Sequence, residues 1–257
     1  KNRNSQGAEN NPSSDSDTGH YEYGRMLCRQ GDLFLKVDSV VNFGLRYETT
    51  QSNDDKPLSK QDKRYLASWR ILCKLIPGFE KHMLSLGGDR KQRKSICSDI
   101  MAGMNKARSD DTSAFKTRIT SYMLLGAPNA AVTPPLSSDG TKQDRGFHHL
   151  QTARLLCPIK YVATAETFTK IRNGELKVTD AMLPRYLYPD DQEYDPKDMS
   201  EGIFRGHIME RALRHLLQGP SLALQAPGTS RGKSGNAAIG GLYSVTPQTI
   251  AYVAVQV

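Results

Sequence analysis

Cysteine, tryptophan and long apolar runs are all scarce in this chain of 257 residues, which holds four cysteines and one tryptophan. The cysteines stand singly, with no CxxC pair and no histidines at zinc-finger spacing, so neither a zinc finger nor a disulfide framework is indicated. No apolar run approaches the roughly 20 residues of a membrane span, and no signal peptide is visible. We therefore expect an intracellular protein, nuclear or cytoplasmic, with reduced thiols and no membrane partner.

The motifs of common enzymes are also missing. There is no GxSxG elbow and no HExxH pair, which removes the usual signs of a serine hydrolase or a zinc protease. Gly232-Lys233-Ser234 resembles part of a phosphate-binding loop, but Pro227 stands where that loop needs glycine. Gly240-Gly241 then interrupt the helix that should follow. The sequence predicts no cofactor and no catalytic residue.

Two acidic groups need to be weighed as metal ligands. Asp99, Asp110 and Asp111 are candidates for a two-metal nuclease, which needs carboxylates converging on ions about 4 Å apart. The simpler interpretation is that the adjacent pair caps a helix. The acidic run from Asp190 to Asp198 lacks the spacing and the final glutamate of a calcium loop, which favours a solvated turn. We predict no metal site.

Charge is distributed unevenly along the chain, whose net charge is +8. Residues 59–125 hold 14 Lys and Arg against 6 Asp and Glu, whereas residues 178–202 hold 2 against 7. A basic focus of this kind favours an anionic partner. Nucleic acid is preferred to membrane, because the stretch lacks the tryptophan-rich apolar face of an interfacial helix.

The basic stretch from Asp89 to Leu125 has one of the clearest helical patterns. Apolar residues recur at helical spacing from Ile96 and again from Phe115, which predicts two amphipathic helices. Asp89 is the expected amino-terminal cap, with Gln92 as its capping-box partner. The polar run 108–112 is expected to hinge the two helices, and a helix-turn-helix is one form that such a hinge takes. The first apolar stripe comprises Ile96, Ile100, Met101, Met104 and Ala107.

Cations crowd the amino-terminal turns of the first of these helices, where the helix dipole disfavours them by about a few tenths of a kcal/mol each. Departures from local preference concentrate at functional sites, and a helix amino end ringed by cations suits an anion. The alternative is a solvated basic face whose long side chains lie over apolar neighbours. The candidate nucleic-acid-binding residues are Arg90, Lys91, Arg93, Lys94, Lys106, Arg108, Lys116 and Arg118.

The whole chain predicts a mainly α-helical, irregular domain with long Pro/Gly-rich loops. Residues 1–20 are expected to be a disordered tail, and residues 21–58 a weakly structured segment, of ambiguous helix or strand period, and a linker. The helical domain is expected over residues 59–257, truncated at its carboxyl end because the last helical pattern has no stop signal. Trp69 is expected to anchor the core. The other predicted helices cover Ser59–Ile76, Phe79–Leu86, Thr164–Asn173, Thr179–Tyr188, Asp198–Leu217 and Gln248–Val257.

Several short segments in combination carry a family resemblance. They are Ile76–Phe79, Ala107–Thr112, Thr152–Pro158, Arg205–His207, Gly219–Ser221, Lys233 with Gly235–Ala237, and Val245–Pro247 with Ile250–Tyr252. With them, the chain from Leu58 to Val257 resembles an uncharacterised, lineage-expanded family of basidiomycete fungi, a domain of unknown function associated with mobile-element-rich genomes. The resemblance implies no activity and transfers no catalytic residue. It implies a Lys-x-Gly-Asn pattern at residues 233–236 instead of a phosphate loop, and a further apolar segment after the last helix.

Three functional hypotheses follow, in order of preference. The first is a non-enzymatic module that binds the phosphate backbone of DNA or RNA through the basic residues named above. The second is a protein-interaction or scaffold domain whose basic helices meet an acidic partner or the acidic segment of the same chain. The third is a metal-dependent nucleic-acid enzyme that uses the three candidate aspartates. No feature of the sequence predicts the oligomeric state.

Overall fold

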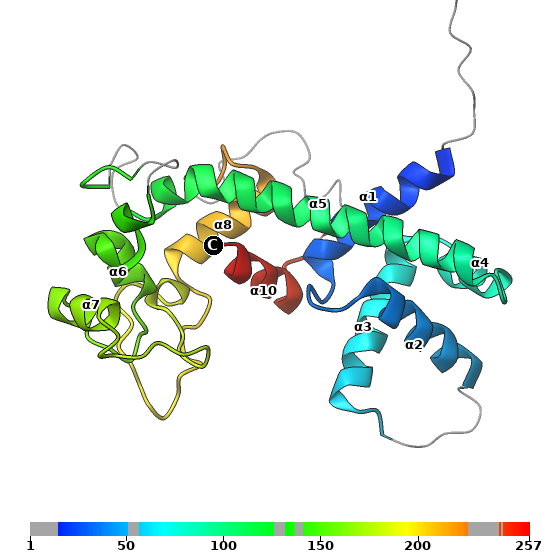
Figure 1. The fold of residues 1–257 in the computed structure, drawn as a ribbon, viewed down its shortest axis with the longest axis horizontal. Helices are drawn as coiled ribbons and strands as arrows, with labels where there is room; N and C mark the ends of the chain where they lie inside the picture. Colours follow the sequence, from blue (N-terminus) through cyan, green and yellow to red (C-terminus); the bar gives the residue numbers. More distant parts are fainter. Residues whose placement is uncertain (1–14, 51–56, 126–131, 137–140, 226–241, 243) are drawn as a thin grey trace, which may run out of the picture. The chain divides into compact units, whose positions relative to one another are not determined.

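A computed structural model describes residues 15–50, 57–125, 132–136, 141–225, 242 and 244–257 of the chain. Helices and turns make up the described residues, with no strand among them, which confirms the predicted mainly α-helical class (Figure 1). The predicted linker at 51–56, most of the predicted tail and the Gly232-Lys233-Ser234 segment lie outside the described residues. The chain divides into two compact units, unit 1 (Lys1–Ala107) and unit 2 (Arg108–Val257).

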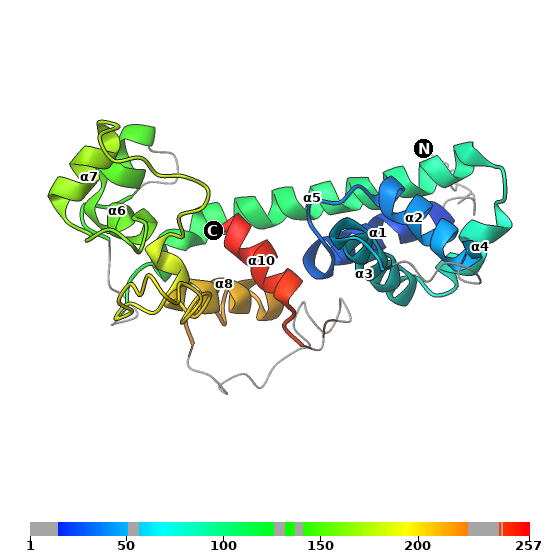
Figure 2. The same ribbon diagram turned by 90° about the horizontal axis from the view of Figure 1, so that it is seen from below.

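The described residues of unit 1 form four helices and the first half of a fifth. Residues 21–47, whose period was ambiguous, form parts of two helices and no strand pair, and the first helix begins inside the predicted tail. The second helix packs against the third, which follows the predicted linker, so the chain on both sides of Ser59 belongs to one unit (Figures 1 and 2). The helices are α1 (Asp15–Gln30), α2 (Val37–Thr50), α3 (Lys60–Leu75), α4 (Phe79–Ser85) and α5 (Arg90–Tyr122).

Trp69 of α3 lies at the centre of the unit 1 core, as predicted. Its side chain is 1% exposed, its ring centroid is 5.8 Å from that of Phe79, and its indole N–H donates to Glu48 at 3.3 Å. Gly44 of α2 faces the indole so closely that a Cβ there would lie 2.1 Å from the ring. The close packing of this core therefore requires glycine at position 44 as well as the large side chain of Trp69.

Local sequence signals set the ends of α3, α4 and α5 in unit 1, and the Asp89 cap is as predicted. The Ser59 hydroxyl accepts the backbone N–H of Asp62 at 3.1 Å, which caps α3. Gly78 adopts the left-handed conformation (φ 72°) between α3 and α4, where glycine avoids a Cβ clash. The Asp89 carboxylate accepts the backbone N–H of Gln92 at 2.9 Å and caps α5. These bonds satisfy N–H groups that have no partner within the helix.

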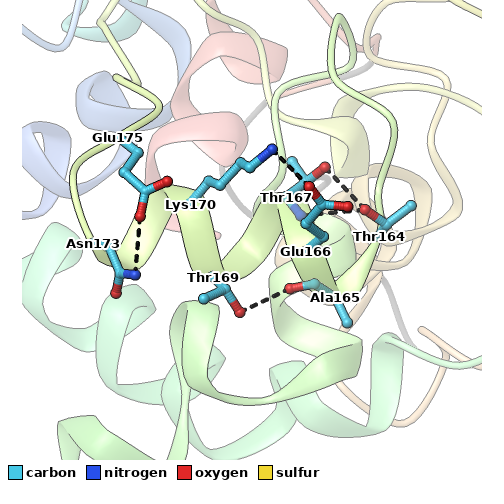
Figure 3. A network of polar contacts seen from close by, with 8 residues as sticks. All are labelled: Thr164, Ala165, Glu166, Thr167, Thr169, Lys170, Asn173 and Glu175. Carbon is cyan, nitrogen blue, oxygen red and sulfur yellow. Dashed lines mark hydrogen bonds and ion pairs between the residues drawn. The ribbon is translucent and has the colours of Figure 1, made fainter.

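Unit 2 contains the second half of α5 and shorter elements. The α8 and α10 helices pack on each other, and the side chains of Thr164 and Thr246 cap α7 and α10. Figure 3 shows α7, where Thr164 accepts the N–H of Thr167 at 3.2 Å and Lys170 pairs with Glu166 at 2.6 Å. The elements are η1 (Lys142–Asp144), η2 (Gly146–His148), α6 (Leu150–Leu156), α7 (Ala165–Arg172), η3 (Arg185–Leu187), α8 (His207–Gln218) and α10 (Pro247–Gln256).

The helix predicted over Thr179–Tyr188 is wrong, because only η3 forms there. The backbone of this segment pairs instead with residues 157–159. The Ile159 N–H donates to the Leu183 carbonyl at 3.0 Å, and the Arg185 N–H donates to the Cys157 carbonyl at 2.9 Å. Pairing with a distant segment thus replaces the local helical bonds.

The helix predicted from Asp198 to Leu217 begins nine residues later, at His207. Gly202 (φ 73°) and Phe204 (φ 64°) both have positive φ angles, which no right-handed helix contains. The predicted carboxyl end is correct, since Gly219 closes α8 by donating its N–H to the carbonyls of Arg214 and His215. The turns before His207 therefore shorten the helix, and the spacing of apolar residues gave no sign of them.

The predicted hinge at residues 108–112 is also wrong, because α5 runs without a break from Arg90 to Tyr122. Residues 108–112 contain no glycine or proline that would interrupt the helix. Its polar side chains have tertiary partners on α10: Tyr252 donates its hydroxyl to Asp111 at 2.7 Å, and Thr112 bonds Gln256. Asp111 is 8% exposed and holds α5 against α10 within unit 2. A helix-turn-helix at this position is therefore excluded.

A buried polar cluster lies further along α5. The Tyr122 hydroxyl lies 2.9 Å from Nδ1 of His215 on α8, and the ring of Phe115 packs on the imidazole with centroids 4.7 Å apart. Burial raises the pKa of Tyr122, so the phenol keeps its proton as a donor. Burial lowers the pKa of His215, with Asp111 opposing and Arg118 adding to the effect. A neutral imidazole that accepts at Nδ1 fits this site.

The carboxyl end of α5 is bonded by two side chains of α8. Arg211 donates to the carbonyls of Tyr122 and Leu124 at 2.7 and 2.6 Å, and His207 Nε2 lies 3.0 Å from the Met123 carbonyl. These carbonyls have no partner within the helix, and their negative dipole end favours cations. The contact fixes where α5 stops without a glycine.

The crossing of α1 and α5 in unit 1 depends on two glycines. A Cβ on Gly24 would lie 2.1 Å from the Ile100 carbonyl oxygen, and one on Gly103 would lie 2.0 Å from that of Tyr21. Both obstacles are backbone atoms, which cannot rotate away as a side chain does. The two helices therefore approach at a distance that only glycine permits.

Replacing Gly103 with alanine should destabilise unit 1, although alanine is the better helix former by about 1 kcal/mol. The overlap with the Tyr21 carbonyl should outweigh that gain and cost about 1–3 kcal/mol. Urea unfolding followed by the fluorescence of Trp69, the sole tryptophan, reports on this unit. Ser95→Ala on the exposed face of α5 is the control, with a change below about 0.5 kcal/mol expected. A stabilised Gly103→Ala protein would refute the close crossing.

Unit 2 should lose stability as the pH falls through about 6.5, the unfolded-state value of histidine. The lowered pKa of His215 means that the unfolded chain binds more protons than the folded one just below this value, so acid favours unfolding. Thermal unfolding followed by tyrosine near-UV circular dichroism between about pH 7.5 and 5 tests this. His215→Leu should flatten the dependence; an equally steep profile in that variant would assign the effect elsewhere.

Candidate nucleic-acid interface

A groove of about 1040 Å³ lies in unit 1, between the start of α2 and the first half of α5. The α5 residues that line it recur every three or four positions, so they form one face of the helix. This face borders the buried stripe of Ile96, Ile100 and Met104. The lining residues are Lys36, Asp38, Asn42, Arg90, Arg93, Lys94, Cys97, Ser98, Met101, Ala102 and Asn105.

The lining is strongly basic. Arg90, Arg93 and Lys94 belong to α5, and Lys36 immediately precedes α2. Asp38 is the single acidic residue among the lining side chains that the structure describes. The first turn of α5 holds no acidic residue either, and the carboxylate nearest to it in sequence is that of Asp89, which caps the helix. The groove is thus built to attract an anion.

The wall of the groove is apolar at Cys97, Met101 and Ala102. Cys97 is only 4% exposed, and burial raises the pKa of its thiol to about 12, with Asp38 adding to the rise and Arg93 opposing it. The thiol therefore stays protonated and is a poor nucleophile. Met101, expected on the core stripe, is half-buried and lines the groove instead.

The arrangement suits an extended anionic ligand better than a small one. Small-molecule sites usually measure about 300–1,000 Å³, and the volume of this groove, about 1040 Å³, lies at the upper limit of that range. Guanidinium groups bind phosphate through paired donors, and lysines add point charges. Asn42 and Ser98 add polar groups beside the cations. A phosphodiester strand offers repeated charges along such a surface.

The structure brings together only part of the predicted site. Arg90, Arg93 and Lys94 line the groove, whereas Lys91 is exposed on α5 outside the lining. Lys106 belongs to unit 1 but does not line the groove, and the remaining candidates belong to unit 2. Those remaining residues are Arg108, Lys116 and Arg118. Lys36 was not identified from the sequence as part of the site. In the sequence it is only a single lysine that precedes a possible helix, which does not distinguish it from other lysines.

The carboxylates considered for metal chemistry do not converge. Asp99 and Asp110 lie eleven residues apart on one continuous helix, which separates them by roughly 16 Å along its axis. Asp111 is engaged with Tyr252. Across the part of the chain that the structure describes, no cluster of three or more His, Cys, Asp or Glu side chains suits a metal ion. The same part holds no helix long and apolar enough to cross a membrane.

Residues 102–257 match the model of a family of unknown function, DUF6698. The chain belongs to this family. The resemblance to a domain of unknown function is thereby confirmed, over a shorter range than the expected Leu58–Val257. The DUF6698 match covers all of unit 2 but meets the groove lining only at Ala102 and Asn105. No curated protein and no solved structure matches the chain.

The thiol of Cys97 should be almost inert in the folded protein. With a pKa of about 12 against the ordinary 9.0, its thiolate fraction near pH 8 is about 10³-fold smaller than in the unfolded chain. Alkylation by iodoacetamide, followed by mass spectrometry in buffer and in urea, should differ by at least that factor. Comparable rates in the two solvents would show that the groove wall is open at Cys97.

Proposed function

We propose that unit 1 is a non-enzymatic module that binds the phosphate backbone of DNA or RNA in this groove. The observation that carries the proposal is the convergence of Lys36 with Arg90, Arg93 and Lys94 on one surface. These side chains come from two elements that are separate in sequence, so their meeting is a product of the fold. A solvated basic face on a single helix would need no such partner.

The electrostatics favour phosphate over a carboxylate ligand. Four cations against Asp38 leave the lining with a net charge of about +3 at neutral pH. Each phosphate that such a surface neutralises releases condensed counterions, which supplies most of the affinity of a backbone-binding protein. Arg90, Arg93 and Lys94 also stand together in the first turns of α5, on one side of that helix.

The proposal is for backbone binding without sequence readout. The single helix α5 lacks the turn that would present a recognition helix to a major groove. Contacts to phosphate position a protein on nucleic acid but carry no sequence information. The module should therefore bind many sequences with similar affinity.

The cellular setting is part of the same proposal. An intracellular protein, nuclear or cytoplasmic, would meet nucleic acid directly. A basidiomycete family associated with mobile-element-rich genomes, as the sequence resemblance implies, would be consistent with such a role. A fluorescent-protein fusion in a basidiomycete host would test the location, and exclusion from both nucleus and cytoplasm would oppose it.

Binding to nucleic acid should be lost when the groove cations are reversed. We would measure the affinity of the whole chain for single-stranded RNA, single-stranded DNA and duplex DNA across salt. Four neutralised phosphates predict a slope of log K against log salt of about −3 to −4. Arg90→Glu, Arg93→Glu and Lys94→Glu together should remove most of this slope.

The matched control changes the same net charge outside the groove lining, with Lys91→Glu, Lys116→Glu and Arg118→Glu together. It should retain most of the affinity and most of the salt slope. Equal losses in both triple variants would mean that overall charge, and not the groove, drives binding. No binding to any of the three nucleic acids would contradict the proposal and favour an acidic protein as the partner.

A further inference from the structure

Unit 2 contains a second recess, of about 210 Å³, which the nucleic-acid proposal does not use. Its volume is below that of most small-molecule sites and suits one large side chain. Tyrosine and methionine dominate the opening: Tyr194 is 37% exposed and Met199 53% exposed. The lining comprises Pro158, Ile159, Lys160, Thr179, Ala181, Met182, Leu183, Tyr188, Tyr194 and Met199.

The walls of this recess are held in place by hydrogen bonds. The bonds of Ile159 to Leu183 and of Arg185 to Cys157 join the two segments that form one side. The Arg185 guanidinium also donates to the Ile159 and Tyr161 carbonyls, at 3.3 and 3.2 Å. On the other side, Tyr188 donates its hydroxyl to the Met199 carbonyl at 2.8 Å. The recess is therefore largely preformed, which lowers the entropic cost of filling it.

The edge of the recess is acidic. Tyr194 and Met199 belong to residues 190–201, which hold six Asp and Glu against one Lys. Asp195 and Asp198 accept N–H groups of their own turns and stay exposed. The Glu193 side chain is exposed and next to Tyr194 in the sequence. Lys160 is the one cation among the described residues that line the recess.

We propose that this recess is a docking site for a basic peptide segment that carries a large aliphatic side chain. The aliphatic group would enter between Tyr188, Met182 and Met199, where thioethers adapt to its shape. Flanking lysines and arginines would lie along residues 190–201. An acidic edge repels nucleic acid, so the partner class is protein. The recess lies wholly within the residues that match DUF6698, and this proposal does not depend on the groove of unit 1.

The probe is a fluorescein-labelled heptapeptide, Lys-Arg-Lys-Leu-Lys-Arg-Lys, titrated with the whole protein and followed by fluorescence anisotropy. Three sets of results are expected. The leucine peptide binds, a peptide with serine in place of leucine binds about tenfold more weakly, and a peptide with glutamates in place of the cations does not bind. Ala181→Phe, at an exposed position of the lining, weakens binding of the leucine peptide by about tenfold or more.

Matched variants separate the recess from general effects. Ala251→Phe, at an exposed position of α10, controls for Ala181→Phe; Glu175→Lys, exposed and outside the lining, controls for Glu193→Lys. Glu193→Lys should weaken binding, while both controls bind as the unchanged protein does. The proposal is overturned if the leucine peptide shows no binding up to about 1 mM, if the serine peptide binds equally well, or if Ala181→Phe and Glu193→Lys leave the affinity unchanged. Circular dichroism confirms that each variant is folded.

Discussion

Both units depend on the burial of one row of apolar side chains along α5. In unit 1 the row is Ile96, Ile100 and Met104, and in unit 2 it continues as Phe115 and Tyr122. A fully buried side chain of this size contributes about 1.5–3 kcal/mol through removal from water. Among the described helices, α5 is the one that crosses the boundary between the units and contributes buried side chains to both. Mutations that weaken its helical structure should therefore affect two cores at once.

Much of the fold was predictable, because the signals are local. The ends of α3, α7 and α10 follow from the hydroxyls of Ser59, Thr164 and Thr246, each of which accepts an N–H three residues later. Apolar spacing identifies the buried faces. The errors come from contacts that spacing cannot reveal. Asp111 and Thr112 look like a turn in sequence, yet partners on α10, 141 and 144 residues away, keep them helical.

The candidate site was also predictable in part, for the same reason. Charge density along the sequence pointed to the amino-terminal turns of α5, and Arg90, Arg93 and Lys94 do line the groove. It gave no means of separating them from Lys91, because the side of a helix on which a groove opens is a tertiary property. Charge density also could not predict that Lys36 belongs to the site, because the packing of unit 1 brings this residue to the same surface. The acidic segment was likewise visible, but the recess beside it needs the pairing of residues 157–159 with residues 183–185.

The match to the family model does not begin where a helix begins. The DUF6698 match starts at Ala102, inside α5 and thirteen residues after the Asp89 carboxylate that caps this helix. A helix cut there would begin with four uncapped N–H groups and without Gly103's partner helix α1. The detectable signature of this family therefore starts in the middle of a cooperative structural element. Truncations should be designed from the helix cap, not from the homology boundary.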